Sequence, residues 1–224
     1  MGISPGATTP RPVRLECADV ALNGDLALPA FARGLVIFAH GSGSSRHSPR
    51  NRAVAELLQH GRLGTLLLDL LTEREERADA STAEFRFDMP LLAHRLVGAI
   101  DWMQVHPQTA PLPIGLFGAS TGAAAALMAA AQRPAMVRAV VSRGGRPDLA
   151  APVLERVRVP TLLIVGGNDE PVLSLNREAL TQLGGGHRLV VVPGATHLFE
   201  EPGALETVAS LAADWFEDHF RAAA

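Results

Sequence analysis

A serine flanked by glycines carries the first chemical signal in this sequence. The residues from Gly118 to Gly122 read Gly-Ala-Ser-Thr-Gly and lie between an apolar run that begins at Ile114 and an alanine-rich run. A G-x-S-x-G string between a strand and a helix holds its serine on a sharp, strained turn, because small residues on either side let the chain pack closely. The pattern predicts that Ser120 is a nucleophile exposed above a sheet.

A serine hydroxyl is a weak nucleophile at neutral pH, so this chemistry requires a base and an acid that orients the base. Asp169 follows the apolar run 161–165, and His197 follows the apolar run 188–192. Both would lie just past the carboxyl end of a strand, where the functional groups of open α/β sheets collect. We therefore expect Ser120, Asp169 and His197 to form a catalytic triad in this chain order.

The neighbouring carboxylate offers an alternative acid. Glu170 would point in a different direction from the same turn, and the spacing from Gly167 and Val172 favours Asp169. Among the other histidines, His40 is expected to shape a loop next to the site rather than to transfer protons.

The elements that must position these residues follow a regular alternation. Short apolar runs alternate with helical stretches, which is the pattern of a buried parallel sheet with helical crossovers. The expected strands are 34–39, 64–70, 114–119, 137–142, 160–165 and 188–192, and the expected helices are 51–60, 89–106, 121–132, 149–157, 175–183 and 205–221. The predicted fold is α/β, with a mostly parallel sheet of about eight strands flanked by helices and no large cap domain.

The start of the chain differs from this alternation. Residues 1–12 are rich in Pro, Gly and Thr and are expected to form a flexible tail, followed by one α/β domain over residues 13–224. Within that domain, 14–20 and 22–28 can form an antiparallel hairpin joined at Asn23-Gly24, which is a strong signal for a tight turn.

A charged segment, Thr72 to Asp88, interrupts the alternation with residues of both signs. One interpretation is a solvated loop or short surface helix held by Glu and Arg pairs. The alternative is a flap over the active site that offers Phe85, Phe87 and Met89 to a substrate.

The sequence resembles the α/β-hydrolase superfamily, and more narrowly its small bacterial dienelactone-hydrolase-like serine hydrolases. The resemblance rests on His40-Gly41, the elbow around Ser120, the G-x-D-x-x-V string 167–172 and the G-x-x-H string 194–197, and it spans about Gly34 to the C-terminus. Dienelactone hydrolase itself has a Cys nucleophile where this chain has Ser120, so the resemblance implies the fold and the general chemistry.

The resemblance also implies an oxyanion hole. Attack by Ser120 on a carbonyl creates an oxyanion, and the backbone N–H of Thr121 at a helix start is placed to donate to it. The second donor would be the N–H of Ser42, after the early strand. His40 and Phe199 join the aromatic and apolar residues of the charged segment as possible substrate contacts.

Several arginines lie close to the predicted site. Arg46, Arg50 and Arg52 follow the early strand, and Arg143 and Arg146 follow a later one. Arginines in loops are usually solvated, and the alternative is a small anion-binding patch beside the site.

Composition excludes several other classes of protein. The net charge of -3 and pI near 6.2 leave no surplus of positive charge for nucleic acid or anionic membranes. The single cysteine allows no internal disulfide, and no spacing of His, Cys or carboxylates suggests a metal or other cofactor. The N-terminus resembles no signal peptide, so we expect a cytoplasmic protein without a membrane span, and its oligomeric state stays open.

The function predicted from these residues is hydrolysis of small or short-acyl carboxylic esters through an acyl-enzyme. The same triad could serve a thioesterase, a lactonase or dienelactone hydrolase, or a peptidase. An alternative from another class is a non-catalytic binding protein on the same fold, because fold does not fix function.

Overall fold

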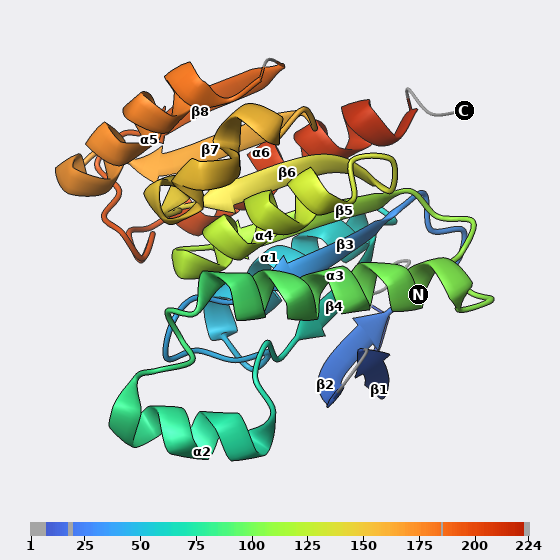
Figure 1. Cartoon of the computed structure of the whole chain (residues 1–224). Helices are drawn as coiled ribbons and strands as arrows, with labels where there is room; N and C mark the ends of the chain where they lie inside the picture. The colour runs from blue at the N-terminus through green and yellow to red at the C-terminus, as the bar shows by residue number, and fades with distance from the viewer. Residues whose placement is uncertain (1–7, 18–19, 185, 222–224) are drawn as a thin grey trace.

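An eight-stranded sheet forms the centre of the protein (Figure 1). The computed structural model describes residues 8–17, 20–184 and 186–221. The strands lie in the order β1-β2-β4-β3-β5-β6-β7-β8. Their bounds are β1 Arg11–Cys17, β2 Val20–Ala27, β3 Leu35–Ala39, β4 Gly64–Leu68, β5 Ile114–Ala119, β6 Val137–Arg143, β7 Thr161–Gly166 and β8 His187–Val192.

The six strands from β4 to β8 in this order are parallel, while β1 and β2 join the β4 edge in antiparallel fashion. Strands β3, β4, β5, β6 and β7 are almost wholly buried, as expected for apolar strands covered on both faces. The predicted α/β architecture with a mostly parallel sheet is confirmed.

Helices cover both faces of the sheet (Figure 1). One face packs against α3 (Met89–Val105), α4 (Thr121–Gln132), the 3-10 segment η1 (Pro147–Arg156) and α5 (Glu170–Gln182). The other face packs against α1 (Pro49–His60) and α6 (Ala204–Arg221). The remaining helix, α2 (Glu73–Thr82), stands apart from both layers.

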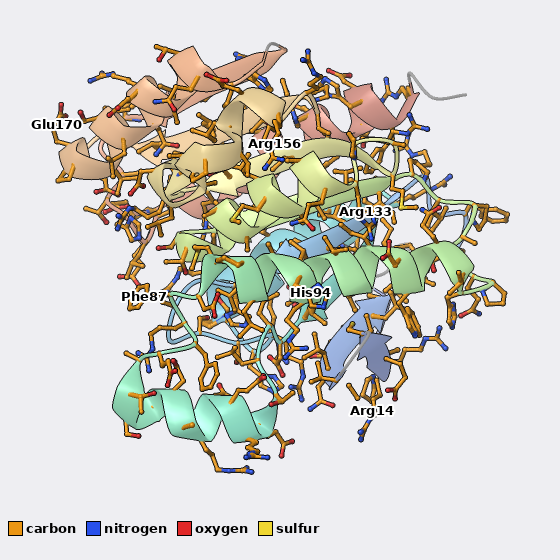
Figure 2. The ribbon with its side chains drawn as sticks, viewed as in Figure 1. Arg14, Phe87, His94, Arg133, Arg156 and Glu170 are labelled. Atoms are coloured by element: carbon orange, nitrogen blue, oxygen red, sulfur yellow. The ribbon has the colours of Figure 1, made fainter. Side chains whose placement is uncertain are left out.

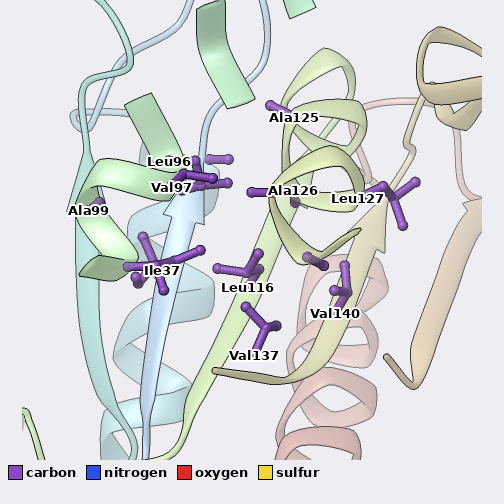
Figure 3. Close-up of a cluster of buried hydrophobic side chains, with 14 of the residues drawn as sticks. Ile37, Leu96, Val97, Ala99, Leu116, Ala125, Ala126, Leu127, Val137 and Val140 are labelled. Carbon is purple, nitrogen blue, oxygen red and sulfur yellow. The ribbon is translucent and has the colours of Figure 1, made fainter. Parts of the chain in front are cut away.

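Two apolar clusters hold these layers together. The α3/α4 face contains small alanines of α4 against strand residues such as Ile37, Leu116 and Val140 (Figure 3). On the α1/α6 face, the rings of Phe38 and Phe117 lie 4.8 Å apart. Because alternate residues of a strand point to opposite faces, each central strand contributes to both clusters.

The predicted hairpin exists, but the predicted position of its turn is wrong. Asn23 and Gly24 lie inside β2, where they pair with Arg14 and Val13 of β1, while Cys17 pairs with Val20. Gly24 is required for close packing instead, since a Cβ there would lie 2.9 Å from the side chain of Leu66. Residues 18–19 lie outside the described part of the chain.

The N-terminal prediction overlaps the sheet by two residues, because β1 already begins at Arg11. The first seven residues of the expected tail lie outside the described residues.

The charged segment contains α2, in agreement with the surface-helix interpretation. Thr72 begins the helix with a capping box, in which its side chain accepts from Glu75 N and Glu75 bonds back to Thr72 N. The side chain of Asp79, near the C-terminus of α2, holds the chain that follows the helix. It accepts hydrogen bonds from the N–H groups of Phe85 and Arg86 and from Arg86 Nε, at 2.7, 2.9 and 2.6 Å. Polar contacts therefore fix α2.

Candidate active site

Ser120 occupies the sharp turn between β5 and α4. Its φ of 51° and ψ of -120° form a strained conformation for a residue other than glycine. The glycines two positions away make the turn possible. A Cβ on Gly118 would lie 2.4 Å from Ala123 Cα, and one on Gly122 would lie 2.3 Å from the carbonyl oxygen of Ala39. The sequence signal for this turn thus has a steric cause.

The other two predicted residues meet beyond the ends of β7 and β8. His197 Nδ1 lies 2.6 Å from Asp169 Oδ2. The two loops are tied together by Asn168, whose N–H and Nδ2 donate to the carbonyl oxygens of Ala195 and Gly194, both at 2.9 Å. Asp169 can thereby orient the imidazole and leave Nε2 as the free ring nitrogen.

A turn after β6 brings Ser120 and His197 to the same place. Ser120 N–H donates to the carbonyl of Arg143 at 3.1 Å, and its own carbonyl accepts from Arg146 N–H at 3.1 Å. Gly144 lies between these two contacts with φ 52°, and a Cβ there would lie 3.5 Å from His197 Nδ1. The serine and the imidazole thus pack against one four-residue segment.

No hydrogen bond joins the Ser120 hydroxyl to the His197 ring among the residues described. Such bonds are often long or misaligned without substrate and tighten only in the complex.

Gly144 and Asn176 are structural members of the site that the sequence interpretation missed. The buried Asn176 side chain donates to the carbonyl of Gly145 at 2.9 Å and to that of Val172 at 2.8 Å, which fixes the turn against α5. The consecutive glycines after an apolar strand were a usable signal for a tight turn. Asn176 gave no such signal.

The loop after β3 lies against the nucleophile. A Cβ on Gly41 would be 3.1 Å from Ser120 Cβ, so this glycine allows the close approach. Ser42 N–H, an expected oxyanion donor, donates to Thr121 Oγ1 at 2.8 Å. Its N–H therefore points toward the start of α4, where the second expected donor is located.

His40 links this loop to the end of β4. Nε2 of its ring accepts from Leu70 N–H at 3.1 Å, and Nδ1 lies 2.9 Å from the Gly41 carbonyl. Burial lowers the pKa of His40, which favours the neutral ring with the proton on Nδ1. Both nitrogens are therefore occupied, which fits a role in shaping the loop.

A cavity of about 350 Å³ opens beside the loop, on the side of α2. Its polar lining includes His40, Ser42, Asp69, Asp79 and Arg86. It also includes Thr121, the residue after Ser120, while Ser120 and His197 are not among the lining residues. Apolar contacts come from Leu71, Ala80 and Leu92. The charged segment thus forms one wall of a cavity next to Ser120.

The aromatic and apolar residues expected to touch a substrate lie elsewhere. Met89, at the start of α3, is 5% exposed and points into the core. Phe199, in the tight loop after His197, is 1% exposed and is also a core residue. Phe85 is half-buried, and Phe87 is exposed on the loop between α2 and α3 (Figure 2). The cavity lining includes none of these four side chains.

Glu170, the alternative acid, faces solvent. Its carboxylate lies 3.7 Å from Arg177 Nη1, and its side chain is 75% exposed at the edge of the molecule (Figure 2). Asp169, with 12% side-chain exposure, is the carboxylate that contacts the imidazole.

Within the described ranges, the side chains of His, Cys, Asp and Glu form no group of three or more that could hold a metal ion. The helices of the same ranges include none long and apolar enough to cross a bilayer.

The sheet order, the strained serine turn and the Asp169–His197 pair are features of the α/β-hydrolase fold. The profile of the Dienelactone hydrolase family matches residues 53–222, and the chain belongs to that family. Its position in the family is supported by a dienelactone hydrolase from Anabaena variabilis, which is 58% identical with a TM-score of 0.92. The comparison covers 94% of this chain and 99% of that one.

More distant structures share the fold. Est1E from Butyrivibrio proteoclasticus has 16% identity and a TM-score of 0.79, over 94% of this chain and 99% of that chain. An esterase from Pyrococcus furiosus has 18% identity and a TM-score of 0.74, over 95% and 92% of the two chains.

A longer relative carries a different name. A protein of Mycobacterium tuberculosis with the provisional name of phosphoribosyl transferase is 58% identical over 207 residues. These residues are 92% of this chain and 46% of that protein, so the chain spans about half the length of the curated relatives it matches. The name belongs to the longer protein.

Proposed function

We propose that the protein is a carboxylic ester hydrolase with Ser120 as nucleophile, His197 as base and Asp169 as the orienting acid. The observation that carries this proposal is the 2.6 Å contact between His197 Nδ1 and Asp169 Oδ2, at the same sheet edge as the strained serine. Ser120 and the Asp169–His197 pair both pack against residues 143–146, and acyl transfer requires a nucleophile, a base and an orienting acid of these types.

In the proposed acylation step, His197 Nε2 takes the proton of the Ser120 hydroxyl as Oγ attacks the ester carbonyl carbon. The tetrahedral intermediate then expels the alcohol, which receives that proton from the imidazolium. Asp169 stabilises the imidazolium through Nδ1. In deacylation, His197 activates water, which attacks the acyl-serine and releases the acid and the free hydroxyl.

The oxyanion would be held by the N–H groups of Thr121 and Ser42. Thr121 N–H lies at the start of α4, where the helix dipole also favours negative charge. Ser42 N–H is bonded to Thr121 Oγ1 in the free protein, so a bound carbonyl oxygen must take over this donor. The exchange keeps the amide satisfied before and after binding.

The cavity beside the loop favours small substrates. Its volume of about 350 Å³ lies at the lower end of the range for small-molecule sites. Apolar side chains line it only in part, so a short acyl or alcohol group fits better than a long lipid chain.

Turnover of p-nitrophenyl acetate and butyrate by wild-type protein and Ser120→Ala tests the proposal. The variant should lose at least about 10³-fold in kcat, because only transition-state binding without a nucleophile remains. Equal turnover by the two folded proteins would overturn it.

A lactone is the second candidate substrate, because the similar Anabaena protein is named dienelactone hydrolase. The same acylation step would open a ring, and the alcohol would stay attached to the acyl group. Comparing kcat/KM for a small lactone and a small open-chain ester separates the two.

A further inference from the structure

A buried arginine that contacts no carboxylate among the described residues is hydrogen-bonded through its backbone to the predicted nucleophile. Arg143 ends β6, and its carbonyl accepts the N–H of Ser120. The residue is 7% exposed, and its side chain shares the sheet face of Ala139 and Val141, toward α1 and α6. A guanidinium stays charged in proteins, so burial without an anion carries a large desolvation cost.

The contacts of Arg143 leave most of its donors unused. Its Nη2 lies 3.4 Å from Asn51 Oδ1, and its Nε and Nη1 have no hydrogen-bond partner among the described residues. Burial, with the positive charge of Arg50, lowers the pKa of Arg143 to about 10. The side chain is aimed at the first turn of α1, where Asn51 is located.

That first turn offers an anion its positive dipole end rather than a set of free amides, because Ser48 Oγ already accepts from Asn51 N–H and the Ser48 carbonyl from Arg52 N–H. Helix α1 begins at Pro49 after the Ser48 cap, and its first turn contains no acidic residue. The positive end of the helix dipole is therefore not neutralised there. Arg50 adds a second guanidinium, whose Nε also lacks a partner within the described part of the chain.

Other arginines near the site are paired with less exposed carboxylates, whereas Arg143 has no carboxylate contact among the described residues. Arg46 is paired with Asp69, Arg52 with Asp25 at 3.2 Å, and Arg146 with Asp148 at 2.7 Å. Within the described ranges, the carboxylate that pairs with Arg50 is that of Glu200, at 2.9 Å, a residue with 63% side-chain exposure three positions after His197. The carboxylate of Glu200 is thus the group that an incoming anion would replace.

We propose that Arg143, Arg50 and the first turn of α1 bind a phosphate-type dianion, either free phosphate or the phosphoryl group of a ligand. Two guanidinium groups and an unneutralised helix start match a dianion better than a monoanion. The site would adjoin Ser120, whose N–H donates to the Arg143 carbonyl.

Isothermal titration calorimetry with inorganic phosphate at constant ionic strength tests the site without any need for catalysis. Wild-type protein should show saturable binding, at least about tenfold tighter than acetate. Arg143→Met and Arg50→Gln should each weaken it by about tenfold or more, because each removes a charged donor. Glu200→Gln should tighten it, since the internal competitor is lost.

Arg52→Gln is the matched control, because it removes one positive charge from the same helix at an exposed position. Phosphate affinity in this variant should stay within about threefold of wild type, since only screened long-range charge is lost. Should Arg143→Met fail to fold, Arg50→Gln and Glu200→Gln still give opposite shifts. Absent binding in wild type, or equal affinity in all the variants, would overturn the proposal.

Inhibition of p-nitrophenyl acetate hydrolysis by phosphate separates the two sources of the anion. Competitive inhibition would indicate that a substrate carries the phosphoryl group into the site, and binding without inhibition would indicate free phosphate. If the ester is not hydrolysed at all, the proposed function fails while the calorimetric result stands.

Discussion

The turn around Ser120 and helix α2 border the same cavity, yet they are held in different ways. The turn is fixed by backbone contacts between buried strands, where a single Cβ at Gly122 would meet a carbonyl at 2.3 Å. Helix α2 is fixed by polar contacts, chiefly Asp79 with Arg86 and Glu75 with Arg95 at 2.9 Å. The turn around Ser120, held by buried backbone packing, is called here the rigid half of the candidate substrate site. Helix α2, held by side-chain polar contacts, is called the adjustable half, and it lies across the cavity from the turn.

This difference suggests a division of roles. The proposed chemistry needs groups held within a few tenths of an ångström, which close-packed backbone supplies. Substrate choice needs a wall that can change without disturbing those groups. A substitution in one of the two halves should therefore leave the other half unchanged.

Replacing the imidazole should have the largest effect on the rigid half. His197→Gln should lower kcat/KM for p-nitrophenyl acetate by about 10³-fold to 10⁵-fold, because both proton transfers lose their base. Steady-state kinetics with circular dichroism of the folded protein checks this. Unchanged turnover would remove His197 from the mechanism.

Substitutions at the two adjacent carboxylates should have clearly different effects on kcat. Asp169→Asn should lower kcat by about 10²-fold to 10⁴-fold through loss of imidazole orientation. Glu170→Gln, at an exposed position, should change it by less than about twofold. The reverse pattern would assign the acid to Glu170.

Adding one methyl group to the elbow should destabilise the fold. Gly122→Ala forces a Cβ against the carbonyls of Ala39 and His40, at a cost of about 2–4 kcal/mol. Gly203→Ala is the control. Its φ of +80° makes an alanine there less stable by about 1 kcal/mol, but no atom lies within 4 Å of the added Cβ. Chemical denaturation measures both, and equal losses would contradict the packing argument.

Loosening α2 should have the smallest effect on the chemistry. Asp79→Asn should speed amide exchange over residues 73–82 by about tenfold while exchange in β5 is unchanged. Glu73→Gln, an exposed position on the same helix, serves as the control. Hydrogen exchange by mass spectrometry reports both regions, and a matching increase in β5 would show that the two halves are not independent.

The same contact gives α2 a defined pH dependence. Burial raises the pKa of Asp79, but hydrogen bonds from Arg86 and Phe85 outweigh it and bring the net value below its ordinary 3.8. The contact therefore contributes stability above about pH 3.8 and loses it as the pH falls through the lowered pKa. Protection of α2 against exchange, taken relative to the intrinsic rate at each pH, should fall in wild type below pH 4, and in Asp79→Asn it should not.

The central strands could be predicted because they are short, apolar and buried on both faces. The turn around Ser120 could be predicted because a side chain at Gly118 or Gly122 would clash with nearby backbone, so the sequence itself carries the signal. The hairpin turn was misplaced because Asn23-Gly24 is a turn signal by local chemistry, while Gly24 is small for a contact with Leu66, far away in the sequence.

Contacts between loops were also harder to predict, because the residues that touch are far apart in the sequence. Gly144 supports His197 from a different loop, and Asn176 holds that loop from α5. Neither pairing has a local pattern. The position of Met89 after a charged segment favours a substrate contact, but the first turn of α3 directs it into the core.

Labelling with a fluorophosphonate probe, followed by peptide mass spectrometry, tests the central claim most directly. The probe reacts with an activated serine hydroxyl and depends on no particular substrate. We predict one labelled site, Ser120, with labelling slowed strongly in His197→Gln and in Asp169→Asn. An unlabelled Ser120 in folded wild-type protein, or labelling that is equally fast in both variants, would contradict the account.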